Sequence, residues 1–151
     1  MDWTARVDAK ASFAFAIESA AIATVVALTA KGRLFSELNQ WWLFILYFIG
    51  LALLLLAAAL AALVVAPRLR TRKAKDEATE NFIYFGHVRN WDAGDLATAL
   101  ERERIVPQIS AQIVRMAKIA WTKHIRVQWS FRAAIVGGLV LVFCGLLRSF
   151  S

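Results

Sequence analysis

Reactive side chains are scarce in this sequence. Its 151 residues include one cysteine and two histidines, and a single cysteine excludes an internal disulfide framework. Cys144 lies in an apolar run, where we expect it to be a small buried hydrophobe. The sequence has no zinc-type spacing, no glycine-rich phosphate loop and no nucleophile elbow. We therefore expect no enzymatic activity, no metal site and no cofactor.

Two long stretches contain almost no charged residues. The 26 residues from Trp41 to Ala66 contain none, and the 20 residues from Ala11 to Ala30 contain only Glu18. A helix needs about 20 apolar residues to cross a bilayer. With 60% hydrophobic residues and a mean hydropathy of +0.55, the chain falls among membrane proteins.

A third apolar stretch follows a polar middle segment. It runs from Val127 to about Ser149 and includes Arg132, which can reach the headgroups from near a helix end. We therefore predict an all-α membrane protein with a single domain over 1–151. Its three transmembrane helices are expected at about 11–30, 41–66 and 127–149, with a small helical cytoplasmic module at 67–126 between the second and third spans.

The charges on either side of these spans predict an orientation. Residues 67–131 hold 12 basic and 7 acidic residues, whereas 31–40 hold two basic residues and one acidic residue. Positively charged loops stay in the cytoplasm. We expect a multi-pass protein of the cell inner membrane, with the N-terminus and 67–131 in the cytoplasm. The mixed charges of 1–10 give no sign of a cleavable signal peptide.

Local signals predict the helices of the middle segment. Residues 74–87 have apolar and aromatic side chains at helical spacing. Asp92 or Asp95 is expected to cap a short helix that runs to Arg104. Pro107 suits the first turn of a long final helix, which has no break signal before Gly137. The sequence leaves open whether this helix is continuous with the third span.

Glu18 is the residue of the first span whose insertion into a membrane is energetically least favourable. An ionised carboxylate inside a membrane helix costs about 2.5 kcal/mol or more. It needs a polar partner, water or a proton. Two roles are open to it, a polar clamp between helices and a gating or pore-lining position, and we hypothesise that it pairs with Arg132.

The basic residues of the last helix have two interpretations. They form either a charged stripe facing solvent and headgroups, or an anion pocket shared with the N-terminal segment at the membrane edge. In the second case, aromatic residues of the middle segment would stack on a planar base. The candidate ligand-binding residues are Asp8, Lys10, Tyr84, Phe85, His87, Arg115, Lys118 and Lys123.

Three features resemble a known family. Asp8-Ala9-Lys10-Ala11, at the start of the first membrane helix, is similar to the DxKA motif of the transmembrane effectors of Pycsar antiphage systems. The aromatic stretch 82–87 and the long helix 108–123 that continues into a final span follow the same pattern.

The resemblance implies a function. In Pycsar systems a cyclase makes cyclic CMP or cyclic UMP on infection, and the effector senses this nucleotide and disrupts the inner membrane, which causes abortive infection. A small module would borrow surface from neighbouring subunits, so we expect a homo-oligomer in contact with membrane lipid and no nucleic-acid partner. The alternative is a small membrane adaptor, or a channel or transporter subunit, that binds a protein partner through 67–131.

Overall fold

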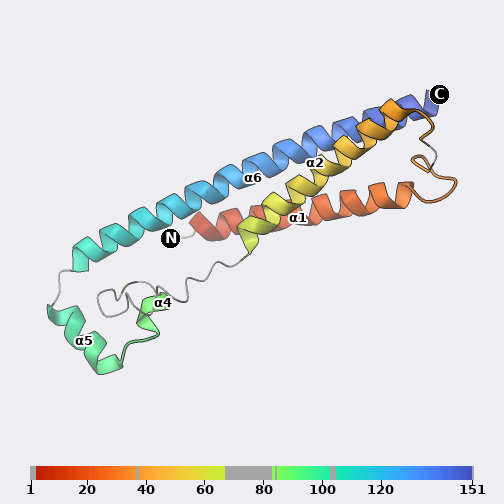
Figure 1. Cartoon of the computed structure of the whole chain (residues 1–151). Helices are drawn as coiled ribbons and strands as arrows, with labels where there is room; N and C mark the ends of the chain where they lie inside the picture. The colour runs from red at the N-terminus through yellow and green to blue at the C-terminus, as the bar shows by residue number, and fades with distance from the viewer. Residues whose placement is uncertain (1–2, 37, 67–82, 84, 103–104, 151) are drawn as a thin grey trace. The chain divides into compact units, whose positions relative to one another are not determined.

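Helices make up all the regular structure in the part of the chain that the computed structural model describes, which is residues 3–36, 38–66, 83, 85–102 and 105–150. The expected all-α fold class is confirmed. The elements, in chain order in Figure 1, are α1 (Trp3–Leu28), α2 (Trp41–Val65), α4 (Phe85–Val88), α5 (Ala93–Arg102) and α6 (Ile105–Phe150).

Three of these helices are long and apolar enough to cross a membrane. Their spanning segments are Ala5–Leu28, Trp41–Val65 and Ile105–Phe150, which confirms the three expected spans. The first helix begins at Trp3 rather than at Ala11. The charges of its first turns favour a polar tail, but Val7 is only 2% exposed and packs as part of the helix bundle.

The last helix is continuous. α6 extends over 46 residues, and Gly137 and Gly138 lie within it without ending it. Pro107 occupies its first turn, as predicted, where a missing backbone N–H costs no hydrogen bond. The amphipathic part of the middle segment and the third span are therefore one element, which Figure 1 draws from teal to blue.

The chain divides into two compact units. The first comprises Met1–Ala66 and Thr122–Ser151, and the second comprises Pro67–Trp121. In the second unit, Asp92 rather than Asp95 caps α5, because its Oδ1 accepts a 2.9 Å hydrogen bond from the Gly94 N–H. The helix expected over 74–87 falls mostly outside the described residues.

The first unit is a three-helix bundle with a repeating buried stripe on each helix. Buried positions are separated mostly by three or four residues, which is the pattern of helices packed as in a left-handed coiled coil. The stripes comprise Val7, Ala11, Ala14, Glu18 and Val25 on α1; Leu43, Tyr47, Gly50, Leu54, Ala57, Ala61 and Val64 on α2; and Val127, Ser130, Gly137, Leu141 and Cys144 on α6.

Two glycines allow α2 and α6 to approach closely in the bundle. A methyl group added to Gly137 would lie 2.9 Å from the backbone oxygen of Gly50 and 2.9 Å from Cβ of Leu53. A methyl group added to Gly50 would lie 2.6 Å from Cγ of Leu141. The absence of both side chains therefore sets the distance between these two helices, as small residues do in membrane helix pairs.

The connection between α1 and α2 folds back onto the bundle. Gly32 has a φ of 76°, which a residue with a side chain rarely adopts. The Phe35 N–H then donates a 2.9 Å hydrogen bond to the Leu28 carbonyl, and the Phe35 ring lies 5.3 Å from the ring of Tyr47. This turn closes the end of the bundle opposite the N-terminus.

Candidate functional site

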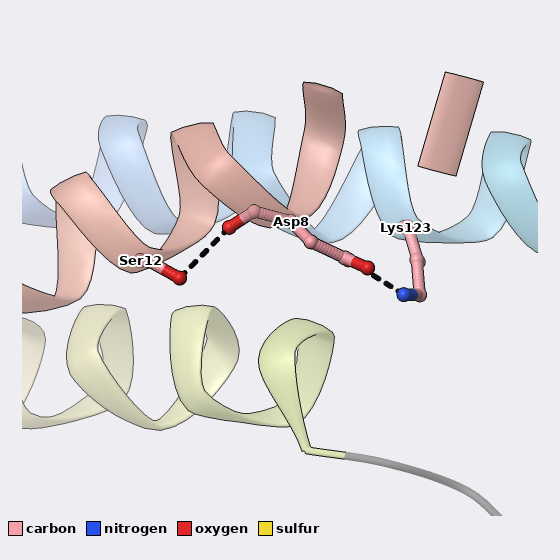
Figure 2. Close-up of polar contacts among 3 residues, drawn as sticks. All are labelled: Asp8, Ser12 and Lys123. Carbon is pink, nitrogen blue, oxygen red and sulfur yellow. Dashed lines mark hydrogen bonds and ion pairs between the residues drawn. The ribbon is translucent and has the colours of Figure 1, made fainter. Parts of the chain in front are cut away.

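An ion pair joins α1 to α6 near the start of the chain. Nζ of Lys123 lies 2.6 Å from Oδ1 of Asp8. Figure 2 draws this contact as a dashed line. The Lys123 side chain is 23% exposed and the Asp8 side chain 37% exposed, so solvent reaches both groups. Two residues that one of the two sequence interpretations groups in an anion pocket are thus in direct contact.

The helix periodicity explains this contact. Asp8 follows Val7 and is one turn from Ala11, which are both buried against Val64 and Val127. Lys123 lies on the α6 stripe four residues before Val127, so its stem points toward the bundle and its ammonium group reaches the edge. The pair therefore forms where the apolar layers of the bundle end.

Asp8 is also part of the regular helix. The Ser12 hydroxyl donates a 2.9 Å hydrogen bond to the backbone carbonyl of Asp8 (Figure 2). Because this bond uses the main chain, the Asp8 carboxylate remains available to Lys123. Because the ammonium group of Lys123 is partly exposed, another anion can reach it and replace the Asp8 carboxylate as its partner.

The other candidate ligand residues belong to α1 and to the second unit. Lys10 is exposed, two residues from Asp8 and therefore about 200° around the helix from it. In the second unit, Arg115 and Lys118 are exposed on α6, whereas His87 is only 4% exposed in α4. Phe85 begins α4, and Tyr84 lies outside the described residues.

A second polar contact joins α1 to α6 inside the bundle. The hydroxyl of Ser130 donates a 2.6 Å hydrogen bond to Oε1 of Glu18, and both side chains are buried, at 0% and 3% exposed. The other oxygen, Oε2, is buried without a hydrogen-bond partner. Glu18 therefore clamps two spanning helices through one oxygen.

The hypothesis that Glu18 pairs with Arg132 is wrong. Arg132 is exposed, and its guanidinium carbon lies 5.2 Å from the centre of the Trp129 ring. Ser130 is two residues earlier and faces the opposite side of α6, toward the bundle. The sequence does contain a feature that points to Ser130. It lies seven residues, or two helical turns, after Lys123, so both residues lie on the same face of α6.

An apolar groove separates α1 from α6 beyond the Glu18–Ser130 contact. It has a volume of about 810 Å³ and extends from Glu18 to the far ends of both helices. The residues that line it include Ile17, Val25 and Leu28 on α1 and Phe131, Val142 and Leu146 on α6. In this half of the bundle, α1 and α6 are therefore less closely packed than α2 and α6 are at Gly50.

Comparison with families of known proteins gives one decisive match. The Pycsar effector protein domain (PycTM) matches the chain over residues 1–149. The chain belongs to the Pycsar effector family. It is thus a membrane protein of an antiphage defence family, as the resemblance at Asp8-Ala9-Lys10-Ala11 predicted. No curated protein and no solved structure matches it.

Proposed function

We propose that this Pycsar effector binds a cyclic pyrimidine mononucleotide, cyclic CMP or cyclic UMP, and then disrupts the inner membrane, so that the infected cell stops growing before phage matures. The observation that carries the proposal is the ion pair between Asp8 and Lys123, which joins two spanning helices at a solvent-accessible edge. In this proposal the chain acts by binding and conformational change, without catalysis.

The ion pair contains a cationic group to which the ligand can bind. A cyclic mononucleotide carries one negative charge on its phosphate, and a phosphate forms strong charge-assisted contacts with an ammonium group. Lys123 already holds one anion, the carboxylate of Asp8, at 2.6 Å. The phosphate would replace Asp8 as the partner of Lys123 and leave the Asp8 carboxylate to solvent. The other candidate contacts, Lys10, Arg115 and Lys118 among them, remain predictions.

This exchange would weaken the contact between α1 and α6. The described polar contacts between α1 and α6 within the bundle are Asp8–Lys123 and Glu18–Ser130, and a groove separates the two helices beyond them. In contrast, α2 and α6 meet backbone to backbone at Gly50 and Gly137. A ligand that binds better when Asp8 is released shifts the population toward bundles in which α1 has moved away from α6 at the Asp8–Lys123 contact.

Loss of membrane integrity requires several copies in this proposal. The described spans of one subunit bury their stripes against one another, so the axis of the bundle is filled by side chains. We therefore propose a homo-oligomer in which the release of Asp8 allows the α6 helices of neighbouring subunits to surround the leak. The N-terminus and the arginine-rich segment that follows α2 would lie in the cytoplasm, where the nucleotide is made.

Binding and leakage measured on the same preparation test the proposal. Full-length protein in detergent is titrated calorimetrically with cyclic CMP, cyclic UMP and, as a control, cyclic AMP. The same protein in dye-loaded liposomes of bacterial lipid then reports leakage. We expect a cyclic pyrimidine nucleotide to bind and release dye, and Lys123→Ala to weaken binding by about tenfold or more, since hydrogen bonds to charged groups contribute about 1.5–3 kcal/mol.

The matched control for Lys123→Ala is Lys31→Ala, which removes the same charge from the loop between α1 and α2. Absence of binding by either pyrimidine nucleotide would contradict the proposal and favour a membrane adaptor that binds a protein through 67–131. Binding without leakage would support the proposed nucleotide binding and contradict the proposed membrane disruption.

A further inference from the structure

Arg132 is a charged residue on the outward face of a spanning helix. It lies two residues after Ser130, and Gln128 lies two residues before Ser130, so each is about 200° around α6 from the buried stripe, in opposite directions. Both side chains are exposed. The arginine and the glutamine thus share a face that points directly away from the bundle.

The contacts of Gly137 give the depth of this face. Gly137 meets the backbone of Gly50 and the side chain of Leu53, and Leu53 is the middle residue of the span Trp41–Val65. Arg132 precedes Gly137 by five residues, which is about 7.5 Å along the helix axis. The hydrocarbon half-thickness is about 15 Å. The backbone of Arg132 is therefore well inside the hydrocarbon layer.

Lipid is a poor environment for this group. Charged residues in spanning segments are rare and almost always face the interior of a bundle or a water-filled cavity. In this subunit Arg132 faces neither, and its described contact is the ring of Trp129 at 5.2 Å. The polar surroundings that it requires must come from outside its own bundle.

The spanning helices of a second copy offer no carboxylate to pair with it. Within the described spans the acidic residues are Asp8 and Glu18. Asp8 lies at the level of Lys123, nine residues and therefore about 13.5 Å along the helix axis from Arg132, and Glu18 is 3% exposed. α6 itself contains no acidic residue. A second copy can thus surround Arg132 with water and with its own Gln128 and Arg132, but not neutralise it.

We infer that Gln128 and Arg132 line the water-filled path of the assembled effector and give that path a preference for anions. The inference rests on the proposed function and adds a property to it, the charge of the species that leaks. Rings of arginine or lysine select anions in channels because they raise the local anion concentration and repel cations. Each copy in the ring contributes one such charge at the same depth.

Reversal potentials test this preference. Full-length protein in a planar bilayer, with a KCl gradient and added cyclic CMP or cyclic UMP, should give a reversal potential displaced toward the chloride equilibrium potential. Arg132→Gln should move it to zero or toward the potassium side, and Arg132→Lys should keep it. Arg148→Gln removes the same charge from the last turn of α6 and should leave the reversal potential unchanged.

Thiol accessibility gives a readout that does not depend on selectivity. In a Cys144→Ala background, Gln128→Cys and Arg132→Cys should react with a charged water-soluble thiol reagent once nucleotide is present. Phe131→Cys is the matched control, because Phe131 is 41% exposed on an adjacent face and lines the apolar groove between α1 and α6. It should remain unmodified.

The outcomes separate the two claims. A nucleotide-induced current whose reversal potential is the same in wild type and Arg132→Gln, with thiols at positions 128 and 132 no more reactive than one at position 131, would overturn the inference and leave Arg132 with lipid phosphates as its partner. Absence of any nucleotide-induced current would overturn the proposed membrane disruption, and this inference with it.

Discussion

Ser130 on α6 donates a 2.6 Å hydrogen bond to Oε1 of Glu18 on α1, and the two residues are 112 positions apart in the sequence. This bond occupies the layer of the bundle between two apolar clusters, one around Val7 and Val127 and the other around Val25 and Leu141. A specific polar contact between apolar layers fixes which faces of α1 and α6 meet, because any rotation of either helix would leave the carboxyl group without its partner.

Removal of the Ser130 hydroxyl should destabilise the bundle. Ser130→Ala leaves both carboxyl oxygens of Glu18 buried without a hydrogen bond, which we expect to cost about 1 kcal/mol, in the range measured for interhelical hydrogen bonds in membranes. Unfolding in mixed micelles monitored by circular dichroism gives this free energy. Ser19→Ala, at an exposed position on α1, is the control. Equal stability of the two variants would mean that the bond contributes nothing.

Two neighbouring glycines in α6 should respond in opposite ways to the same substitution. Gly137→Ala places a methyl group 2.9 Å from the Gly50 carbonyl oxygen, and backbone cannot move aside, so we expect a loss of about 1–3 kcal/mol. Gly138→Ala meets nothing within 4 Å and should be neutral or stabilise the helix by up to about 1 kcal/mol. The measurement is the same unfolding experiment. A Gly138→Ala variant as unstable as Gly137→Ala would refute the close approach of α2 and α6.

Exchange of the two charges tests the ion pair between Asp8 and Lys123. Asp8→Lys and Lys123→Asp, each alone, place like charges at the same contact and should destabilise the bundle, while the double variant restores an attractive pair. We expect a coupling of about 0.5–1 kcal/mol, since both groups are partly exposed, and a decrease of that coupling at high salt. A double-mutant cycle in detergent at two salt concentrations measures it. Additive effects of the two substitutions would exclude the contact.

Labelling in intact cells should reveal the orientation. In a Cys144→Ala background, Ser36→Cys lies in the loop between α1 and α2, and Ala93→Cys lies at the start of α5. A membrane-impermeant maleimide should reach position 36 from the periplasm and position 93 only after the cells are broken, because the basic segment keeps its side of the membrane cytoplasmic. The reverse pattern would invert the topology and place Lys123 out of reach of a cytoplasmic nucleotide.

Most of the fold could be predicted from local signals. Two nearly uncharged stretches predict most of α1 and all of α2. The absence of a break signal before Gly137 allows the final helix to continue into the third span but does not require it, and the structure shows one helix from Ile105 to Phe150. The partner of Glu18 could not be predicted in the same way. Charge complementarity favours Arg132, but the contact depends on the rotation of α6 about its axis, which is set by all the buried positions of the bundle together. A difference of two residues along the helix is enough to exchange the inward face for the outward one.

The site could be predicted in part for a similar reason. One of the two interpretations of the basic residues groups Asp8 and Lys123 in an anion pocket, and the structure places them 2.6 Å apart as partners of each other. Sequence spacing gives the side chains that can meet at a membrane edge, but an ion pair within the protein and a pocket for an anion use the same residue types. Only the three-dimensional arrangement distinguishes a lysine whose ammonium group has no ion-pair partner from one that is already paired with a carboxylate.

The continuity of α6 has a mechanical consequence. At 1.5 Å per residue its 46 residues form a rod about 69 Å long, more than twice the thickness of the hydrocarbon layer. The described rod has no proline after its first turn and no interruption at Gly137. A twist applied to one end therefore travels to the other as torsion instead of being absorbed at a hinge, so that a small turn of the helix near Lys123 swings every side chain beyond it through the same angle.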